Sequence, residues 1–137
     1  MPDSVVPCVG AVIKDEQGRL LLIKRGHEPG AGLWSLPGGR IEPGETDAEA
    51  LVREMQEETG LAVEAGPLLG GVRRPAQDGD VLDIRDYAAT VTGGTLRPGD
   101  DAAEARWVAV SDLPSLPITE GLVEALTSWG VLAQEWQ

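Results

Sequence analysis

The chain has 137 residues, of which 42% are hydrophobic and 25% are charged, a composition typical of a soluble globular domain. Its net charge of −12 argues against binding to nucleic-acid polymers or to anionic membranes. Cys8 is the single cysteine, which excludes an internal disulfide, and no apolar run approaches the roughly 18 residues of a membrane span. We therefore expect one cytoplasmic domain over residues 1–137.

Two strands are predicted at the start of the chain. Residues 5–14 are almost all apolar, which is typical of a strand buried on both faces. Turn residues at 15–18 lead into a second strand over residues 19–25. Arg25 ends this strand and is a candidate substrate contact, with an ordinary surface charge as the alternative.

A glycine-rich loop over residues 32–39 follows the second strand. The adjacent glycines Gly38 and Gly39 allow the backbone to approach a ligand closely. Arg40 comes next and is a candidate phosphate contact or a surface charge. Trp34 has two interpretations, as a ring that stacks on a base or as a packing residue beneath the loop.

A helix is predicted from Thr46 to Gly60. Thr46 and Glu49 have the spacing of a capping box, and glycine is favoured in the left-handed position that ends a helix. Helical spacing also predicts an apolar stripe that faces the core. Its members are Ala48, Leu51, Val52 and Met55.

Three glutamates near the end of this helix share one face. Glu54, Glu57 and Glu58 fall within an arc of about 100°, where they repel one another and oppose the helix dipole. Arg53 can pair with Glu49 or Glu57, but one arginine cannot neutralise the group. A solvated acidic face is one interpretation, and the other is a divalent cation such as Mg²⁺, which takes oxygen ligands from carboxylates and phosphates.

Residues 39–61 resemble the Nudix box of the Nudix hydrolases, a family with MutT-like and ADP-ribose pyrophosphatase-like members. The box reads glycine, five residues, Glu, seven residues, Arg-Glu, an aliphatic residue, any residue, Glu-Glu, any residue, glycine and an aliphatic residue. All nine fixed positions are filled here, by Gly39, Glu45, Arg53, Glu54, Met55, Glu57, Glu58, Gly60 and Leu61. The resemblance implies an α/β fold, namely an α/β/α sandwich with a mixed sheet and a loop–helix catalytic motif.

The resemblance also implies a reaction. Members of the family bind Mg²⁺ or Mn²⁺ and hydrolyse a phosphoanhydride bond in a nucleoside diphosphate linked to another group. Glu54 would be a ligand or the general base, Glu45 a direct ligand or a residue that supports the others, and Arg53 would orient the glutamates. The metal ligands that the resemblance implies are Gly39 (through its carbonyl), Glu45, Glu54, Glu57 and Glu58.

Strands and a loop are predicted after the helix. Residues 62–72 indicate a short strand, residues 73–80 a loop, and residues 81–92 a strand that a turn at Gly93 and Gly94 follows.

The two arginines of that loop stand out in an acidic chain. Arg73 and Arg74 could clamp a second phosphate or a ribose, or could balance the neighbouring aspartates.

An acidic loop over residues 96–104 precedes a strand at residues 105–110. Many Nudix proteins supply a further metal ligand or base from the loop before such a strand, which makes Asp101 and Glu104 candidates by resemblance. Solvated loop charge is the alternative for each. A terminal amphipathic helix is predicted over residues 119–129.

The substrate is expected to be a nucleotide-type small molecule. The compact size, and Pro75 near where ADP-ribose-type members often carry a proline, favour ADP-ribose or a nucleotide sugar. A sanitising (d)NTP pyrophosphohydrolase is the alternative, and a non-catalytic nucleotide sensor is the alternative of another class, although sensors usually lose box glutamates. An isopentenyl diphosphate isomerase would need an active-site cysteine, for which Cys8 is poorly placed. A homodimer is expected only because dimers are common in the family.

Overall fold

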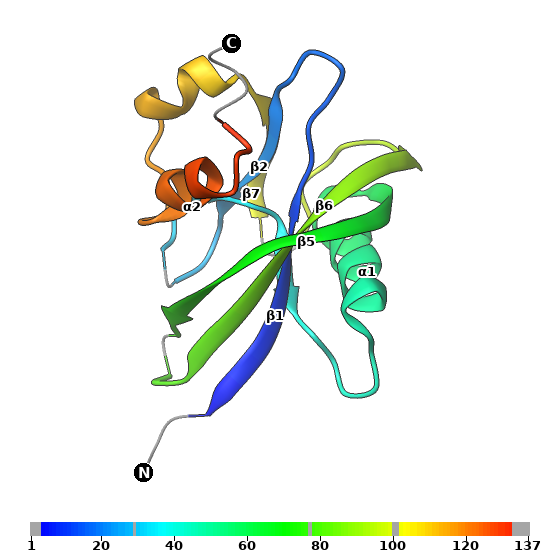
Figure 1. Cartoon of the computed structure of the whole chain (residues 1–137), viewed down its shortest axis with the longest axis vertical. Helices are drawn as coiled ribbons and strands as arrows, with labels where there is room; N and C mark the ends of the chain where they lie inside the picture. The colour runs from blue at the N-terminus through cyan, green and yellow to red at the C-terminus, as the bar shows by residue number, and fades with distance from the viewer. Residues whose placement is uncertain (1–3, 29, 77, 100–101, 133–137) are drawn as a thin grey trace.

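The structure is a computed structural model that describes residues 4–28, 30–76, 78–99 and 102–132. Two sheets lie between two helices, with α1 on one side and α2 on the other (Figure 1). The structure therefore confirms the predicted α/β fold with a mixed sheet.

The strands form one mixed and one antiparallel sheet. The mixed sheet has the order β4–β1–β6–β5, in which β1 and β6 are parallel and the other neighbours are antiparallel. Its strands are β1 (Val5–Val12), β4 (Gly38–Arg40), β5 (Leu61–Pro75) and β6 (Val81–Gly94). The antiparallel sheet has the order β3–β2–β7, made of β2 (Leu20–Arg25), β3 (Trp34–Ser35) and β7 (Ala102–Val108).

Alternation along β1 and β2 divides the interior into two cores. Val9 and Leu21 belong to the core that packs on α1, whereas Val12, Leu20 and Leu22 belong to the core that packs on α2. Because neighbouring strand residues point to opposite faces, a continuous apolar run fills both cores. This confirms burial on both faces for the second half of β1, while Val5 at its start is 51% exposed.

Helix α1 (Asp47–Thr59) begins and ends where the sequence predicts. Thr46 is the N-cap, and Glu49 completes the capping box by accepting a hydrogen bond from the Thr46 N–H. Gly60 takes the left-handed conformation, with φ of 75°.

The apolar stripe predicted for this helix is wrong in part. Leu51 and Met55 are buried, but Ala48 is exposed and Val52 is 42% exposed. The buried face continues from Met55 to Glu58, which is only 9% exposed. The predicted stripe was built from apolar residues alone, so it included Ala48 and Val52 and left out Glu58.

β5 and β6 are longer than predicted. Residues 73–75, predicted as loop, pair with residues 81–83, and Gly93 and Gly94, predicted as a turn, pair with Ala62 and Leu61. The pairing of the two strands shifts register between Ala65 and Leu68, but β5 continues through this irregularity. Residues typical of turns were therefore predicted to end the strands, although the long β5–β6 hairpin includes them in its pairing.

The end of the chain is more irregular than expected. The strand predicted at 105–110 is β7, and the 3-10 helix η1 (Val110–Ser115) follows it. Helix α2 (Leu122–Ser128) is shorter than predicted because Gly121 precedes it in the left-handed conformation, with φ of 85°. Within the described ranges, neither α1 nor α2 has the length and apolar character of a membrane-spanning helix.

Candidate metal and phosphate site

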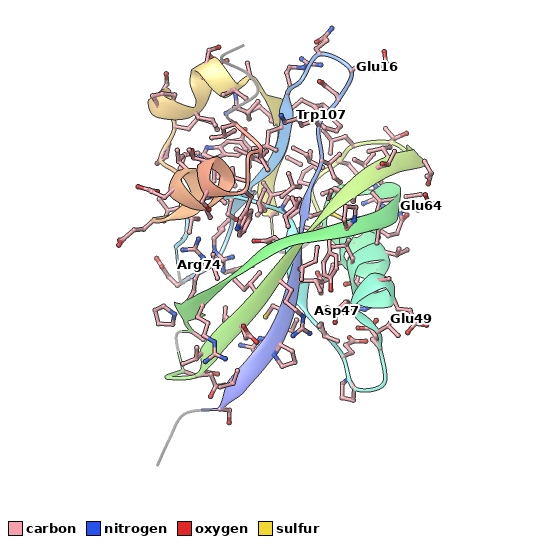
Figure 2. All side chains as sticks on the ribbon, viewed as in Figure 1. Glu16, Asp47, Glu49, Glu64, Arg74 and Trp107 are labelled. Atoms are coloured by element: carbon pink, nitrogen blue, oxygen red, sulfur yellow. The ribbon has the colours of Figure 1, made fainter. Side chains whose placement is uncertain are left out.

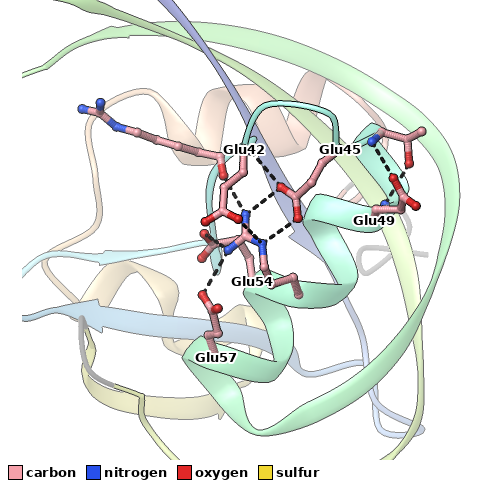
Figure 3. Close-up of polar contacts among 8 residues, drawn as sticks. Glu42, Glu45, Glu49, Glu54 and Glu57 are labelled. Carbon is pink, nitrogen blue, oxygen red and sulfur yellow. Dashed lines mark hydrogen bonds and ion pairs between the residues drawn. The ribbon is translucent and has the colours of Figure 1, made fainter.

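Arg53 is the centre of a network of carboxylates at the glycine loop (Figure 3). Its Nε and Nη2 donate to both oxygens of Glu45 at 2.7 and 2.9 Å. Its Nη1 donates to Glu54 at 3.0 Å and to Glu57 at 3.1 Å. Nη2 also donates to the Arg40 carbonyl at 3.0 Å, so the same guanidinium joins the helix to the loop.

Arg53 stabilises the charged form of Glu45 in this network. Hydrogen bonds from Arg53 lower the pKa of Glu45 to about 2, and those bonds in turn raise the pKa of Arg53. Of the two partners predicted for Arg53, Glu57 is confirmed. Glu49 is not a partner, because the capping box occupies its carboxylate.

Gly39 leaves room for the Glu54 carboxylate, which lies directly against it. A Cβ at position 39 would lie 2.5 and 2.6 Å from the two carboxylate oxygens of Glu54, well inside contact distance. Only glycine therefore lets the Glu54 carboxylate reach the loop backbone.

Glu58 connects the end of α1 to the same loop. Its Oε1 accepts a hydrogen bond from the Gly38 N–H at 2.7 Å. Gly38 has a φ of 155°, and a Cβ there would collide with the Val9 carbonyl, so this position also requires glycine. Glu57 differs from Glu58, because 60% of its side chain is exposed.

The donor set suits a hard divalent cation. The carboxylates of α1 and the backbone of Gly39 offer only oxygen ligands, which Mg²⁺ prefers. The side chains are arranged around Arg53 and Gly38 rather than around a common centre. Accordingly, in the described part of the chain no three His, Cys, Asp or Glu side chains form a group that could hold an ion as they stand.

The structure separates two of the candidate substrate arginines. Arg73 and Arg74 are neighbours on β5 and therefore point to opposite faces. Arg73 lies 3.6 Å from Asp83, and Arg74 donates to the Glu120 carbonyl. Figure 2 shows Arg74 on the side of the sheet that α2 covers and Asp47 on the side of α1. The two arginines therefore do not form one clamp.

Arg40 and Arg25 are better placed for solvent-borne anions. Arg40 is exposed and directly follows Gly39 in β4. Arg25 is half-buried at the end of β2, and its side chain packs against Gly30.

Trp34 lies in the core beneath α2. It is 2% exposed, and the guanidinium of Arg106 lies 4.5 Å from the centre of its ring. These contacts favour the packing interpretation over stacking on a base.

The two acidic candidates before β7 have different outcomes. Asp101 lies outside the described residues. Glu104 lies in β7 itself, 3.5 Å from Lys24 and 3.9 Å from Arg106. The preceding segment packs on the end of α1, because the Gly99 N–H donates to the Glu58 carbonyl at 2.8 Å.

A second ionic contact fixes the start of α1, and the sequence did not predict it. Arg85 of β6 donates to both oxygens of Asp47 at 2.7 and 3.0 Å, and the Tyr87 hydroxyl donates to the same carboxylate. The hydrogen bond from Arg85 lowers the pKa of Asp47. The spacing of Arg85 and Tyr87 predicts a shared strand face, but no local signal identifies their distant partner.

Known proteins resemble the chain along most of its length. Residues 5–128 match the model of the NUDIX domain. An ADP-ribose pyrophosphatase of Methanocaldococcus jannaschii is 41% identical over 85% of this chain and 70% of that protein. A human 8-oxo-dGDP phosphatase is 39% identical over 82% of this chain, which spans only 35% of that protein. The crystal structure of a MutT NUDIX hydrolase from Burkholderia pseudomallei is 34% identical, with a TM-score of 0.81 over 91% of this chain and 98% of that one. The chain therefore belongs to the Nudix family, and it is an enzyme of the class that acts on pyrophosphate bonds.

Proposed function

We propose that this protein hydrolyses a phosphoanhydride bond in a nucleoside diphosphate derivative with the help of Mg²⁺ or Mn²⁺. The observation that carries the proposal is the loop–helix unit, in which Arg53 holds three glutamates beside the Gly39 backbone. Nudix hydrolases generally use divalent metals, and the oxygen donors gathered at this loop are of the kind such ions take.

The proposed ligands are Glu57, Glu58 and the Gly39 carbonyl. Glu54 would be a further ligand or the general base, since its carboxylate lies against Gly39. When bound, the cation would neutralise charge on the phosphates and lower the pKa of an attacking water. Glu57 is the most exposed of the three glutamates, so its side chain has the freedom to turn toward a ligand.

Arg53 and Glu45 would act by positioning the ligands. Both oxygens of Glu45 are bonded to Arg53, which favours a role in orienting the guanidinium over direct metal binding. Arg53 in turn fixes Glu54 and Glu57 relative to the loop. Preorganised groups of this kind are what phosphoryl transfer requires, because most of its catalysis is positioning and charge stabilisation.

Two substrate classes have support from relatives. ADP-ribose or a nucleotide sugar is supported by the archaeal ADP-ribose pyrophosphatase, which is 41% identical. A damaged guanine nucleotide is supported by the human 8-oxo-dGDP phosphatase, which is 39% identical over a shorter share of its length. Arg40 and Arg25 are the proposed phosphate contacts for either class of substrate. Arg73 and Arg74 lie on opposite faces of β5, so at most one of them could contact the same substrate molecule.

A substrate panel tests the proposal. ADP-ribose, nucleotide sugars and (d)NTPs, including 8-oxo-dGTP, would each be incubated with Mg²⁺ or Mn²⁺, and release of nucleoside monophosphate and phosphate would be measured. We expect turnover of at least one compound that stops when EDTA is added. Nucleotide binding without turnover under every condition would instead identify a sensor.

A further inference from the structure

Asp86 is an acidic side chain that the proposed site does not use. It lies in the middle of β6, beside Gly10 of β1 and Gly70 of β5, on the face opposite to Tyr87. Only 3% of its surface is exposed. It is therefore the most deeply buried acidic side chain in the part of the chain that the structure describes.

The carboxyl of Asp86 has no donor in the described part of the chain. Among the described residues, none donates a hydrogen bond to it or forms an ion pair with it. The positive charge of Arg74 acts on Asp86 from a distance and lowers its pKa by less than burial raises it, but the Arg74 guanidinium donates its hydrogen bond to the Glu120 carbonyl. Burial raises the pKa of Asp86 to about 6.

Part of the remaining exposure of Asp86 lies at its carboxyl oxygens. Among the described residues, every side-chain oxygen that is fully shielded from solvent has a hydrogen-bond partner. The carboxyl oxygens of Asp86 have no such partner among these residues. Its unpaired oxygen is therefore one that keeps contact with solvent. Burying a carboxylate without a donor is costly, so an unpaired acceptor that keeps some contact with solvent is a candidate for a ligand contact.

Glycines on both sides make room for this arrangement. A Cβ at Gly10 would overlap Oδ1 of Asp86 and would lie 3.3 Å from its Cγ. A Cβ at Gly70 would overlap the indole of Trp129. The residues beside Asp86 on the two neighbouring strands are therefore glycines without side chains, and the indole of Trp129 lies over Gly70.

One peptide group separates Asp86 from the glutamate site. The Gly38 N–H of the Pro37–Gly38 peptide donates to Glu58. The carbonyl oxygen of the same peptide would lie 3.7 Å from a Cβ built on Gly10, a Cβ that would also overlap Asp86 Oδ1. A nucleotide whose phosphates lie at Glu58 could thus extend past this peptide and place another part of itself at Asp86.

We propose that Asp86 accepts hydrogen bonds from the nucleobase of the substrate and that this base is of the guanine type. An ionised carboxylate only accepts hydrogen bonds, and it does so through two parallel oxygens. Guanine presents two adjacent donors, the ring N–H and the exocyclic amino group. Adenine presents a donor beside an acceptor, whose lone pair would face the carboxylate.

This inference rests on the proposed function, because a nucleotide in the glutamate site is what brings a base to Asp86. It favours a guanine nucleotide over ADP-ribose among the two substrate classes.

Binding of two matched analogues tests the inference without hydrolysis. The α,β-methylene diphosphates of guanosine and inosine differ only in the exocyclic amino group, and calorimetry with Mg²⁺ would compare their affinities. We expect the wild type to bind the guanosine analogue at least about 10-fold more tightly. Asp86→Asn should weaken the guanosine analogue about 10- to 100-fold and remove the preference.

Asp83→Asn is the matched control, since it removes the same charge from the opposite face of the same strand. It should leave the ratio of the two affinities within about twofold. Should Asn disturb the packing over Gly10, which a melting curve would show, the shorter Asp86→Ser provides the same test.

Three results would overturn the inference: equal affinity of the wild type for both analogues, binding of neither, or an Asp86→Asn variant that weakens both equally. Hydrolysis of the substrate panel is scored separately. Turnover without a guanine preference would refute the inference alone. A guanine preference that depends on Asp86, without any turnover, would refute the proposed hydrolysis alone.

Discussion

Acidic side chains occur in two opposite environments in this protein. Beside the glycine loop, both oxygens of Glu45 accept hydrogen bonds from Arg53, which lower the pKa of the Glu45 carboxyl to about 2. Asp86, in the middle of β6, is 3% exposed and has no hydrogen-bond donor among the described residues. Burial raises its pKa to about 6. The same functional group is thus stabilised as an anion in one place and destabilised in the other.

The difference teaches how each site can bind a ligand. Arg53 holds Glu45, Glu54 and Glu57 in place by direct hydrogen bonds, so these carboxylates already have a partner within the protein. Asp86 keeps an unsatisfied acceptor, so it gains hydrogen bonds only when a donor arrives. The first site is suited to cations and phosphates, and the second to a neutral donor group.

Loss of a proposed metal ligand should have the largest effect. Glu58→Gln keeps an oxygen for the Gly38 N–H but removes the negative charge, so the fold should survive while metal-dependent turnover falls about 1,000-fold. Glu57→Gln should act in the same direction. Steady-state kinetics with Mg²⁺ and a melting curve would measure both effects.

The control for these variants is Glu64→Gln, which removes the same charge from an exposed position on β5. It should keep wild-type turnover. Unchanged turnover in Glu57→Gln and Glu58→Gln would mean that the glutamates of α1 do not bind a catalytic metal. The proposed division between a metal site at α1 and a base contact at Asp86 would then be wrong.

Replacement of the central arginine should come next. Arg53→Lys keeps the charge but cannot donate at once to Glu45, Glu54 and Glu57, because an ammonium lacks the planar fork of guanidinium. We expect kcat to fall about 10- to 100-fold. The apparent affinity for Mn²⁺, measured by electron paramagnetic resonance, should weaken as well. Arg106→Lys, which changes an arginine on β7, is the control and should leave both quantities near wild type.

The sequence predicted the helix that carries the glutamates because the signals for its ends are local. Thr46, Glu49 and Gly60 define the ends of α1, and the spacing of the glutamates places them on one face. The same local reasoning failed at Glu58, because burial against the Gly38 N–H depends on where the loop folds back.

Tertiary contacts were beyond prediction for the same reason. Asp47 is an ordinary acidic residue in the first turn of a helix, and only the fold brings Arg85 and Tyr87 to it from 38 and 40 residues away. The β6 sequence contains Asp86 among polar neighbours, which concealed its burial. Arg73 and Arg74 were grouped as a pair because the loop prediction ignored strand alternation.

A pair of glycine variants separates the effect of contact at the glutamate site from the effect of backbone strain. Gly39→Ala would push Glu54 away from the loop, so we expect kcat/KM to fall about 10-fold with little change in stability. Gly44→Ala meets no atom within 4 Å but has a φ of 86°, so it should cost about 1 kcal/mol of stability and little activity. Urea unfolding and kinetics on both variants would distinguish these outcomes, and the reverse pattern would place Glu54 outside the catalytic machinery.

A difference in pH dependence follows from the opposite pKa shifts of the two environments. A folded-state pKa of about 6 for Asp86 lies above the unfolded value, so ionisation destabilises the fold progressively from about pH 4 and fully above about pH 6. Asp86→Asn should therefore stabilise the protein by roughly 1 to 3 kcal/mol at pH 7.5 and by less at pH 4.5.

Glu45 has the opposite sign. Its folded-state pKa of about 2 lies below the unfolded value, so its stabilising contribution is nearly complete above about pH 4.5 and is lost only as the pH falls toward 2. Glu45→Gln should therefore destabilise the protein by nearly the same amount at pH 4.5 and pH 7.5. Urea unfolding of both variants at the two pH values measures the contrast directly. Parallel pH dependences would show that the buried carboxyl of Asp86 is satisfied in solution, and its proposed contact with a base would then have no unpaired acceptor behind it.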